Sequence, residues 1–346
     1  MLELSEPDGA FERLEAYLDE YLRPGTVADV YLGYGLSESL RRDPAPPPPE
    51  PCALPLLACA VRRDEPHDDS SQASFRVGEW EASWEPEEYA AAVETVREAI
   101  RRGDVYQVNL VQHLAAPFAG DPRALAAALA PLAPLHPRAL VGRDWAIVSA
   151  SPELFLARRG ERLWTKPIKG TRPLGVDIDD DKEAAEHVMI VDLERNDLSR
   201  VCEAGTIRWP ELMVQHELAG VTHLVSTVEG QLRPGVSLAE ILHATFPGGS
   251  ITGAPKIAAI DHVARLEPVG RGASMGALGT IRPNGDFDLA LTIRTFAVAA
   301  GRIHLWAGGG IVWDSDAEAE IEESWVKARP LLSAIGLAAV GPPVRA

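Results

Sequence analysis

The sequence has little of what marks several large classes of protein. It contains only three cysteines, Cys52, Cys59 and Cys202, an odd number at wide spacing. This excludes a disulfide framework, offers no zinc-ligand spacing and fits a reducing cytosol. No apolar run approaches the ~20 residues that a membrane span needs. The N-terminus also lacks the basic-then-apolar order of a signal peptide. We therefore expect a cytoplasmic protein that has no membrane association.

Positive charge is scarce as well. The formal net charge is −18, whereas nucleic-acid binders carry a basic surface, so we expect no nucleic-acid partner. Only five of the 33 basic residues are lysines: Lys166, Lys169, Lys182, Lys256 and Lys327. Such a bias is typical of GC-rich coding, yet it makes each lysine informative. Arginine stays protonated, whereas a lysine can lose its proton and act as a nucleophile.

The chain predicts two parts of unequal size. Residues 1–85 form a short N-terminal portion that contains the proline run PAPPPPEP at 44–51, which reads as an extended loop. Residues 86–338 form the larger part. Its hydrophobic periodicity predicts helices at 86–102, 122–133, 182–202, 256–266 and 317–335, and strands at 105–114, 146–150, 154–157, 277–282, 288–298 and 302–313. Because these elements do not alternate strictly, we expect an α+β fold with two large, mostly antiparallel sheets and flanking helices.

The last predicted helix carries the first candidate site. Glu320, Glu323 and Lys327 stand at i, i+3 and i+7 and so share one face. Spacing alone favours a solvated face with a salt bridge. The glycine run Gly308–Gly310 precedes this helix, and such a run either brings backbone N–H groups close to an anion or forms a tight turn. An acidic residue on a second helix, Glu186, could meet these carboxylates and suit a hard cation such as Mg²⁺.

Three further segments carry candidate chemistry. Residues 165–173, TKPIKGTRP, predict a stiff hairpin that presents the amine of Lys169. Glu153 stands at the head of a strand. The glycine-rich run 246–256, FPGGSITGAPK, leads into a helix and could hold an anion at the helix N-terminus. It lacks the order of a P-loop, and no GxGxxG follows a strand, so neither a nucleoside triphosphate nor a dinucleotide is supported.

Taken in order, these segments resemble the chorismate-utilising family that includes anthranilate synthase component I and aminodeoxychorismate synthase component I. The resemblance covers about 86 to 336 and rests on these motifs: GDVYQVNL (103–110), SPELF (151–155), PIKGTRP (167–173), EHVMIVDLERNDLSRV (186–201), HLVST (223–227), FPGGSITGAPK (246–256), GALG (276–279), TIRTF (292–296), AGGGIV (307–312) and EAEIEESWVKAR (318–329).

The resemblance implies that residues 86–338 form a chorismate-binding catalytic domain, and it implies a role for each candidate residue. It implies Mg²⁺ as cofactor, with Glu186 and Glu323 as ligands and Glu320 adjacent. Substrate contacts would come from Arg294, Lys327, Gly308, Gly309 and Gly310, with His223 and Thr252 lining the ring site. Lys169 and Glu153 would be catalytic.

Two positions distinguish the members of the family. Relatives that make isochorismate or salicylate have a water-activating lysine where this chain has Gln107. Anthranilate synthases have alanine where it has Lys169, and proteins with PIKGT look like aminodeoxychorismate synthases. In these, the lysine adds at ring C2 while the glutamate protonates the departing C4 hydroxyl, and ammonia then adds at C4 and expels the lysine. The attack requires a neutral amine.

The resemblance also implies a partner. The three cysteines supply no glutaminase site, so a separate glutamine amidotransferase subunit would deliver ammonia. The product would serve 4-aminobenzoate and folate or a specialised metabolite. Anthranilate or aminodeoxyisochorismate synthesis stays open, as does a non-catalytic paralogue that binds a partner.

The chain departs from the family in several places. Its N-terminal portion is short, and Leu36–Ser39 is too short to identify a tryptophan site. Ser274 and Thr280 replace residues that are commonly aromatic.

Overall fold

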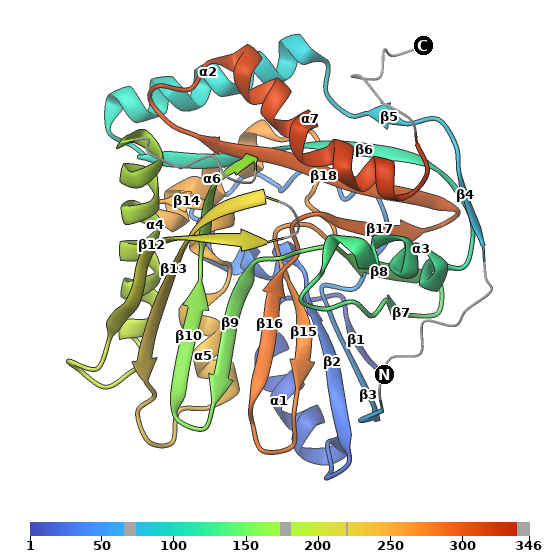
Figure 1. The fold of residues 1–346 in the computed structure, drawn as a ribbon, viewed down its shortest axis with the longest axis vertical. Helices are drawn as coiled ribbons and strands as arrows, with labels where there is room; N and C mark the ends of the chain where they lie inside the picture. The colour runs from blue at the N-terminus through green and yellow to red at the C-terminus, as the bar shows by residue number, and fades with distance from the viewer. Residues whose placement is uncertain (66–73, 174–180, 219–220, 338–346) are drawn as a thin grey trace.

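The computed structural model describes residues 1–65, 74–173, 181–218 and 221–337. Two antiparallel sheets dominate it, and their strands run in different directions (Figure 1). The ten-stranded sheet contains β1 (Leu2–Leu4), β2 (Thr26–Leu32), β3 (Leu57–Arg63), β9 (Leu154–Arg159), β10 (Arg162–Lys166), β11 (Ile168–Pro173), β12 (Arg208–Leu218), β13 (Val221–Gln231), β15 (Ala277–Ile281) and β16 (Phe287–Leu291). The eight-stranded sheet contains β4 (Phe75–Val77), β5 (Glu81–Ala82), β6 (Gln107–Gly120), β7 (Leu140–Val141), β8 (Trp145–Ser149), β14 (Gly253–Ala254), β17 (Thr295–Ala299) and β18 (Arg302–Ile311).

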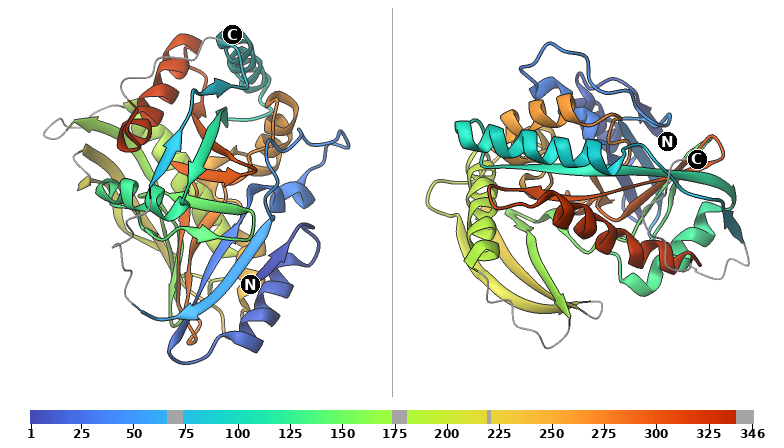
Figure 2. Two further views of the ribbon diagram at one scale, coloured as in Figure 1. Left: turned by 90° about the vertical axis from the view of Figure 1, so that its right-hand side faces the viewer. Right: turned by 90° about the horizontal axis from the view of Figure 1, so that it is seen from above.

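Helices flank both sheets, as Figure 2 shows from two further sides. They are α1 (Ala10–Tyr21), α2 (Pro86–Arg102), α3 (Pro122–Leu129), α4 (Asp181–Ser199), α5 (Leu238–Thr245), α6 (Lys256–Leu266) and α7 (Ala317–Ala334), with 3₁₀ turns η1 (Tyr34–Leu40), η2 (Ala130–Leu132) and η3 (Gly249–Ile251). The predicted α+β fold with large antiparallel sheets is confirmed. Within the described ranges, no helix is long and apolar enough to cross a membrane.

The N-terminal strands belong to the same sheet as the later ones. The order in the larger sheet is β1-β3-β2-β15-β16-β9-β10-β13-β11, with β12 paired to β13. Because β2 pairs with β15 over five residues, residues 1–65 extend a sheet whose other strands come from beyond residue 150. The division at residue 85 stays a prediction. Leu36–Ser39 lies within η1.

Local sequence explains why the longest helices begin and end where they do. Pro86 occupies the first turn of α2, Glu85 and Glu88 form a capping box, and Gly103 closes the helix in a left-handed conformation. In α7, the side chain of Asp316 accepts a hydrogen bond from the backbone N–H of Ala319. Both helices were predicted within one residue of these limits.

Two predicted elements were wrong. Residues 165–173 do not form a hairpin, because β10 and β11 both pair with the same long strand, β13. The predicted strand 288–298 is divided into β16 and β17, which lie in different sheets. Arg294 lies between them with φ of 50°, a backbone conformation outside the β region. The chain therefore crosses from one sheet to the other at a residue that the resemblance assigns to the site.

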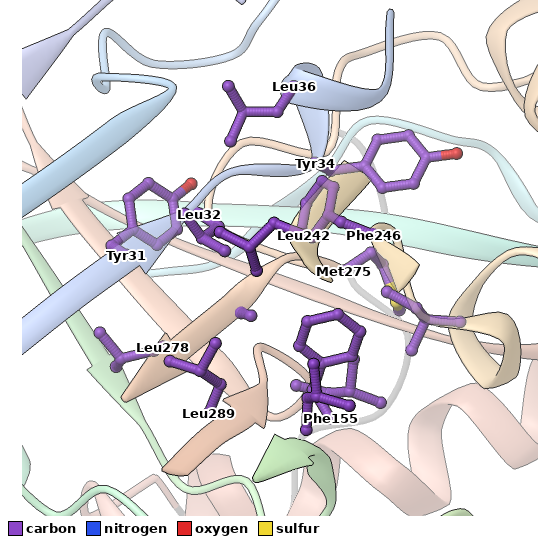
Figure 3. Packing of buried hydrophobic residues seen from close by; sticks show 14 of the residues in the cluster. Tyr31, Leu32, Tyr34, Leu36, Phe155, Leu242, Phe246, Met275, Leu278 and Leu289 are labelled. Atoms are coloured by element: carbon purple, nitrogen blue, oxygen red, sulfur yellow. The ribbon is translucent and has the colours of Figure 1, made fainter. Parts of the chain in front are cut away.

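The larger hydrophobic core packs against the ten-stranded sheet and continues to α2 and to β6 of the other sheet, and Figure 3 shows part of it. Phe155 of β9 contacts Phe246, the residue that ends α5, with ring centroids 6.1 Å apart in an edge-to-face arrangement. A second core lies under α7 and α3, where Trp325 and Leu331 are 3% and 1% exposed. The first core thus fixes the segment that starts at Phe246, and the second fixes α7 against the eight-stranded sheet.

Candidate active site

Glu153 lies in the connection between β8 and β9 and is 6% exposed. Its Oε1 accepts hydrogen bonds from Ser250 Oγ (2.9 Å) and from the backbone N–H of Ile168 (3.3 Å). Burial raises the pKa of Glu153, while these bonds and the positive charges of Lys169 and Arg294 act in the opposite direction. A buried carboxyl group with a raised pKa can hold a proton and donate it, as a general acid must.

Lys169 lies on β11 and His223 on the neighbouring strand, β13. Lys169 pairs with Leu224 across these strands, so it is one register position from His223. His223 is 2% exposed, and its Nδ1 lies 3.3 Å from the carbonyl oxygen of Gly170, so this nitrogen carries the proton of a neutral imidazole. Burial lowers the pKa of His223, and the charge of Arg294 lowers it further. These effects favour the neutral form of the imidazole.

Arg294 completes this group. Burial lowers the pKa of its guanidinium, and the carboxyl group of Glu153 acts to raise it. Its carbonyl oxygen accepts a hydrogen bond from the backbone N–H of Ala150 (2.9 Å), which anchors the crossing between the sheets. Lys169 and Arg294 thus both act on the buried carboxyl group of Glu153.

The glycine run Gly308–Gly310 lies inside strand β18 rather than in a turn. It pairs with Val111, Leu110 and Asn109 of β6, whereas β17 pairs with β18 only as far as Leu305. Among the described strands, β6 alone pairs with the last part of β18. The backbone N–H and C=O groups on the opposite edge of β18 are therefore able to bind a ligand. An added Cβ at Gly308 would lie 1.9 Å from the carbonyl oxygen of Leu110, so this position requires glycine.

Gly309 brings the candidate residues of α7 together with β18. A Cβ built on Gly309 would lie 3.2 Å from Glu320 Oε2, 3.2 Å from Glu323 Oε1 and 3.4 Å from Lys327 Nζ. Lys327 Nζ donates to the carbonyl oxygen of Gly308 (2.9 Å) and pairs with Glu323 Oε1 at 2.6 Å. The predicted shared face of the helix therefore points at the glycine strand and is not simply a solvated surface.

The predicted magnesium ligands are brought together only in part. Glu320 is 7% exposed and lies beside Glu323, whereas Glu186 is half-buried on α4, a helix that packs on β13, β11 and α5. Within the described part of the chain, no group of three or more His, Cys, Asp or Glu side chains is arranged to hold a metal ion. The donor set nevertheless fits a hard cation, because its members are carboxylate oxygens and Mg²⁺ takes only one or two of these beside water and substrate oxygens.

The glycine-rich segment 246–256 joins the two halves of the site. Ser250 binds Glu153, and two residues later the carbonyl oxygen of Thr252 accepts a hydrogen bond from the backbone N–H of Asn109 (2.9 Å). The hydroxyl of Thr252, fully buried, donates to the carbonyl oxygen of Gly248 (3.0 Å). The predicted role of this segment as an anion cradle stays a prediction, and the contacts show that it orients Ser250 and Thr252.

Gln107 is the most conspicuous polar side chain of the site. It is fully buried, and neither atom of its amide has a hydrogen-bond partner in the described residues. A Cβ on Gly310 would lie 2.1 Å from its Nε2, so the amide occupies the space beside the glycine strand. A buried unsatisfied amide is costly and is expected where a ligand completes it.

Sequence reasoning missed a buried ion pair behind the site. Arg271 and Glu267, whose side chains are each 1% exposed, pair at 2.8 Å. The guanidinium also donates to the carbonyl oxygens of Asn109 (2.6 Å) and Ile251 (3.1 Å), and Glu267 accepts from the backbone N–H of Val111 (3.1 Å). This pair holds β6 to the segment that carries Thr252. Only its i, i+4 spacing was visible in the sequence, and many surface pairs share that spacing.

Thr280 and Ser274, which depart from the family pattern, lie in different surroundings. Thr280 Oγ1 donates to Asp29 of β2 (3.2 Å) within the ten-stranded sheet. Ser274 is 1% exposed, and its hydroxyl has no hydrogen-bond partner among the described residues. Ser274 is thus the departure that alters the buried interior.

This geometry agrees with comparisons to known proteins. The family model for chorismate binding enzymes matches residues 41–333. Anthranilate synthase component 1 of Thermus thermophilus is 42% identical over 277 residues, which cover 76% of this chain and 59% of that protein. Aminodeoxychorismate synthase component 1 of Escherichia coli is 40% identical over 277 residues, with 76% and 61% covered. The crystal structure of anthranilate synthase component I from Streptococcus pneumoniae has a TM-score of 0.79 at 28% identity and covers 90% of this chain and 81% of that one.

The chain belongs to the chorismate binding enzyme family. It spans about 59% to 61% of the length of the two curated relatives named above. These two relatives carry different names at nearly equal identity, so overall similarity does not distinguish between their activities.

Proposed function

We propose that this protein is the synthase component of an aminodeoxychorismate synthase, which converts chorismate and ammonia into 4-amino-4-deoxychorismate. The observation that carries the proposal is the placement of Lys169. Its strand, β11, lies beside β13, and its side chain is near enough to the buried carboxyl group of Glu153 to act on it electrostatically. A lysine and a protonated acid in one region supply the nucleophile and the proton that replacement of a hydroxyl group requires.

In the proposed reaction, Lys169 is the nucleophile and Glu153 is the general acid. The neutral amine of Lys169 forms a bond to ring C2 while Glu153 gives its proton to the C4 hydroxyl, which leaves as water. Ammonia then bonds to C4, the double bond shifts back, and the C2–nitrogen bond to Lys169 breaks. The C4 ammonium group returns one proton to Glu153. The sum consumes one chorismate and one ammonia and releases one water, with no net proton uptake.

The other half of the site would bind the substrate's carboxylates. Lys327, Arg294 and the unpaired edge of β18 at Gly308–Gly310 supply positive charge and backbone donors. Glu186 and Glu323, with Glu320 adjacent, would hold Mg²⁺, which when bound would neutralise a substrate carboxylate. Lys327 already pairs with Glu323, so cation and carboxylate binding would occur beside the same side chain. His223 and Thr252 would line the ring.

Gln107 supports amination over hydration. Its amide is neutral and cannot remove a proton from water, whereas a lysine at this position could. Its buried, unpartnered amide is available to the substrate or to the incoming ammonia. Ammonia itself would come from a separate glutamine amidotransferase subunit.

The test is the identity of the product formed from chorismate, Mg²⁺ and an ammonium salt by the purified chain. Liquid chromatography with mass spectrometry separates 4-amino-4-deoxychorismate from anthranilate, which has also lost pyruvate. Aminodeoxychorismate as the main product supports the proposal, and anthranilate as the main product overturns it in favour of the second reading. No turnover, with chorismate still bound, would favour a non-catalytic paralogue.

A further inference from the structure

The buried guanidinium of Arg271 joins two segments that carry different halves of the site. Its Nη2 donates to the carbonyl oxygen of Asn109 (2.6 Å), and its Nη1 donates to the carbonyl oxygen of Ile251 (3.1 Å). Asn109 belongs to β6, the strand that pairs with the glycine run of β18. Ile251 directly follows Ser250, whose hydroxyl donates to Glu153 (2.9 Å). One side chain therefore connects the glycine strand to the segment that holds the candidate general acid.

The two carbonyl oxygens, of Asn109 and Ile251, need a donor between them, because a carbonyl oxygen only accepts hydrogen bonds. A guanidinium has five N–H groups in a planar fork and gives a separate donor to each oxygen. The ammonium group of a lysine has a single nitrogen and cannot reproduce this geometry. Backbone hydrogen bonds through Thr252 and β14 also join the segment to β6. Loss of the fork should therefore shift the segment rather than detach it.

Glu267 fixes the orientation of this fork. Its Oε2 accepts from Arg271 Nε (2.9 Å), and its Oε1 accepts from Arg271 Nη2 (2.8 Å) and from the backbone N–H of Val111 (3.1 Å). The ring of Tyr34 lies over the guanidinium, with 4.6 Å between Cζ and the ring centroid. Both charged side chains are 1% exposed, and desolvation offsets much of the attraction in such a pair. The many directional contacts thus favour a role in geometry over a role in stability.

The backbone on both sides of Arg271 is anchored as well. Trp306 of β18 donates from its Nε1 to the carbonyl oxygen of Gly270 (3.0 Å). The hydroxyl of Tyr31 of β2 donates to the carbonyl oxygen of Gly272 (2.9 Å). Because one anchor comes from each sheet, the turn that carries the arginine is held in place independently of the two segments that the arginine joins.

We propose that Arg271 is a positioning residue that sets the separation between the glycine strand, where the carboxylates of the substrate would bind, and Glu153, which would protonate the C4 hydroxyl. It acts through the backbone of Asn109 and Ile251. A general acid must lie within hydrogen-bond reach of the atom that it protonates, and a misplacement of about 1 Å can lower a rate by about 10²-fold. This inference rests on the proposed function, through the role of Glu153.

The substitution Arg271→Lys tests this role, because lysine keeps the charge opposite Glu267 but lacks the fork. We expect kcat to fall by about 10–100-fold, whereas KM for chorismate should change by less than about threefold. Calorimetric titration with chorismate and Mg²⁺ should give the wild-type stoichiometry, so that an unfolded fraction does not explain the loss. A wild-type kcat per bound chorismate in Arg271→Lys overturns the inference.

The matched control is Arg62→Lys. Arg62 makes a similar two-pronged contact with Asp29 (2.7 and 3.1 Å), between β3 and β2. This substitution removes the same fork from a carboxylate but touches neither β6 nor the segment at Ile251, so kcat should stay at the wild-type value. An equal loss of kcat in the control would show that the effect does not depend on where the fork lies, and would overturn the inference.

A double variant, Glu267→Leu with Arg271→Met, separates positioning from stability. Replacing a buried ion pair by apolar side chains is often neutral or stabilising. We expect a folded protein that still has the reduced kcat, and recovery of the wild-type kcat would refute the inference. If neither this variant nor Arg271→Lys folds, the pair serves the fold itself and the inference fails.

Both rates are measured on whichever product the wild type forms. If that product is anthranilate and Arg271→Lys lowers kcat at full stoichiometry, the proposed function fails while the positioning role stands. If the product is aminodeoxychorismate and kcat is unchanged, the positioning role fails and the proposed function stands. A wild-type protein without turnover overturns both.

Discussion

Residues from the two sheets reach the site under different electrostatic conditions. On the ten-stranded side, Glu153 and His223 are 6% and 2% exposed, and burial is the main cause of the shift in each pKa. On the eight-stranded side, the side chains of Glu323 and Lys327 are 51% and 40% exposed and form an ion pair. Buried groups have their protonation states set by the fold, whereas exposed ions exchange partners readily. We therefore expect the first half to control chemistry and the second half to control binding.

The largest effect should come from Lys169, on the ten-stranded side. Lys169→Ala and Lys169→Arg should both lower kcat by more than about 10³-fold, because neither side chain is an effective nucleophile. Steady-state kinetics with ammonium salt would measure this. Wild-type protein quenched with chorismate in the absence of ammonia should also carry a mass adduct on the peptide that contains Pro167–Gly170. Near-normal kcat in Lys169→Arg would show that the lysine only binds substrate, and the contrast between the two sheets would disappear.

Glu153→Gln should have the next largest effect. Loss of a general acid lowers kcat by roughly 10²–10⁴-fold, with KM little changed. In the wild type, kcat should fall as the pH rises through the pKa of Glu153, which burial has raised above its usual range. The variant should lose this dependence. A large rise in KM with kcat preserved would instead assign Glu153 to the binding half.

Glu323→Gln tests the half of the site that we expect to control binding. Removing this carboxylate should raise the Mg²⁺ concentration needed for half-maximal activity by at least about 10–100-fold, because loss of a group that merely supports a metal ligand already has an effect of that size. The matched control is Glu322→Gln, one residue earlier on the same helix, whose carboxylate is exposed and pairs with Arg329 at 2.7 Å. Full activity of Glu323→Gln without added metal would contradict the assignment.

The smallest effect concerns stability of the eight-stranded sheet. His113 Nε2 lies 3.0 Å from His304 Nδ1 between β6 and β18, and burial is the main cause that lowers the pKa of His113 to about 3 and of His304 to about 4. Because both values lie below the unfolded value of 6.5, the unfolded chain binds more protons as the pH falls below 6.5. Each histidine should therefore cost about 2 kcal/mol of stability between pH 6.5 and 5.

Urea unfolding at a series of pH values would measure this loss. His304→Gln should reduce the slope, whereas His243→Gln, which removes an exposed histidine paired with Glu12, serves as the control. Equal slopes in both variants would show that the buried histidines are not the cause.

Local patterns predicted the elements that depend on local chemistry. Pro86, Gly103 and the acidic first turn of α7 are start and stop signals that act within one turn, so both helices were correctly placed. The motifs around Lys169 and Glu153 located the two catalytic candidates. Pairings across long stretches of chain could not be predicted in this way. β10 and β11 both pair with β13, which lies roughly 50 to 70 residues later in the chain, so the predicted hairpin was wrong.

The sequence also did not show which glutamates would be buried. Glu194 and Glu323 are both glutamates on helices, yet the first is buried beside another carboxyl group and the second is half exposed. Only the packing of α4 against the segment at Gly249 reveals the difference. From the sequence, Gly308–Gly310 could also have formed a turn. Its actual partner, β6, lies about 200 residues earlier in the chain, so local sequence could not reveal the pairing.

The pairing of β2 with β15 has a consequence for the synthesis of the chain. Six of the seven residues of β2 are buried, and one of its edges pairs with residues 277–281. A ribosome adding ~5–20 residues per second takes about 10 to 50 s to make the intervening stretch. During this time β1, β2 and β3 can pair with one another, but β2 keeps an open edge that can join other nascent chains. Pairing with β15 therefore protects β2 from aggregation once the later strands have been made.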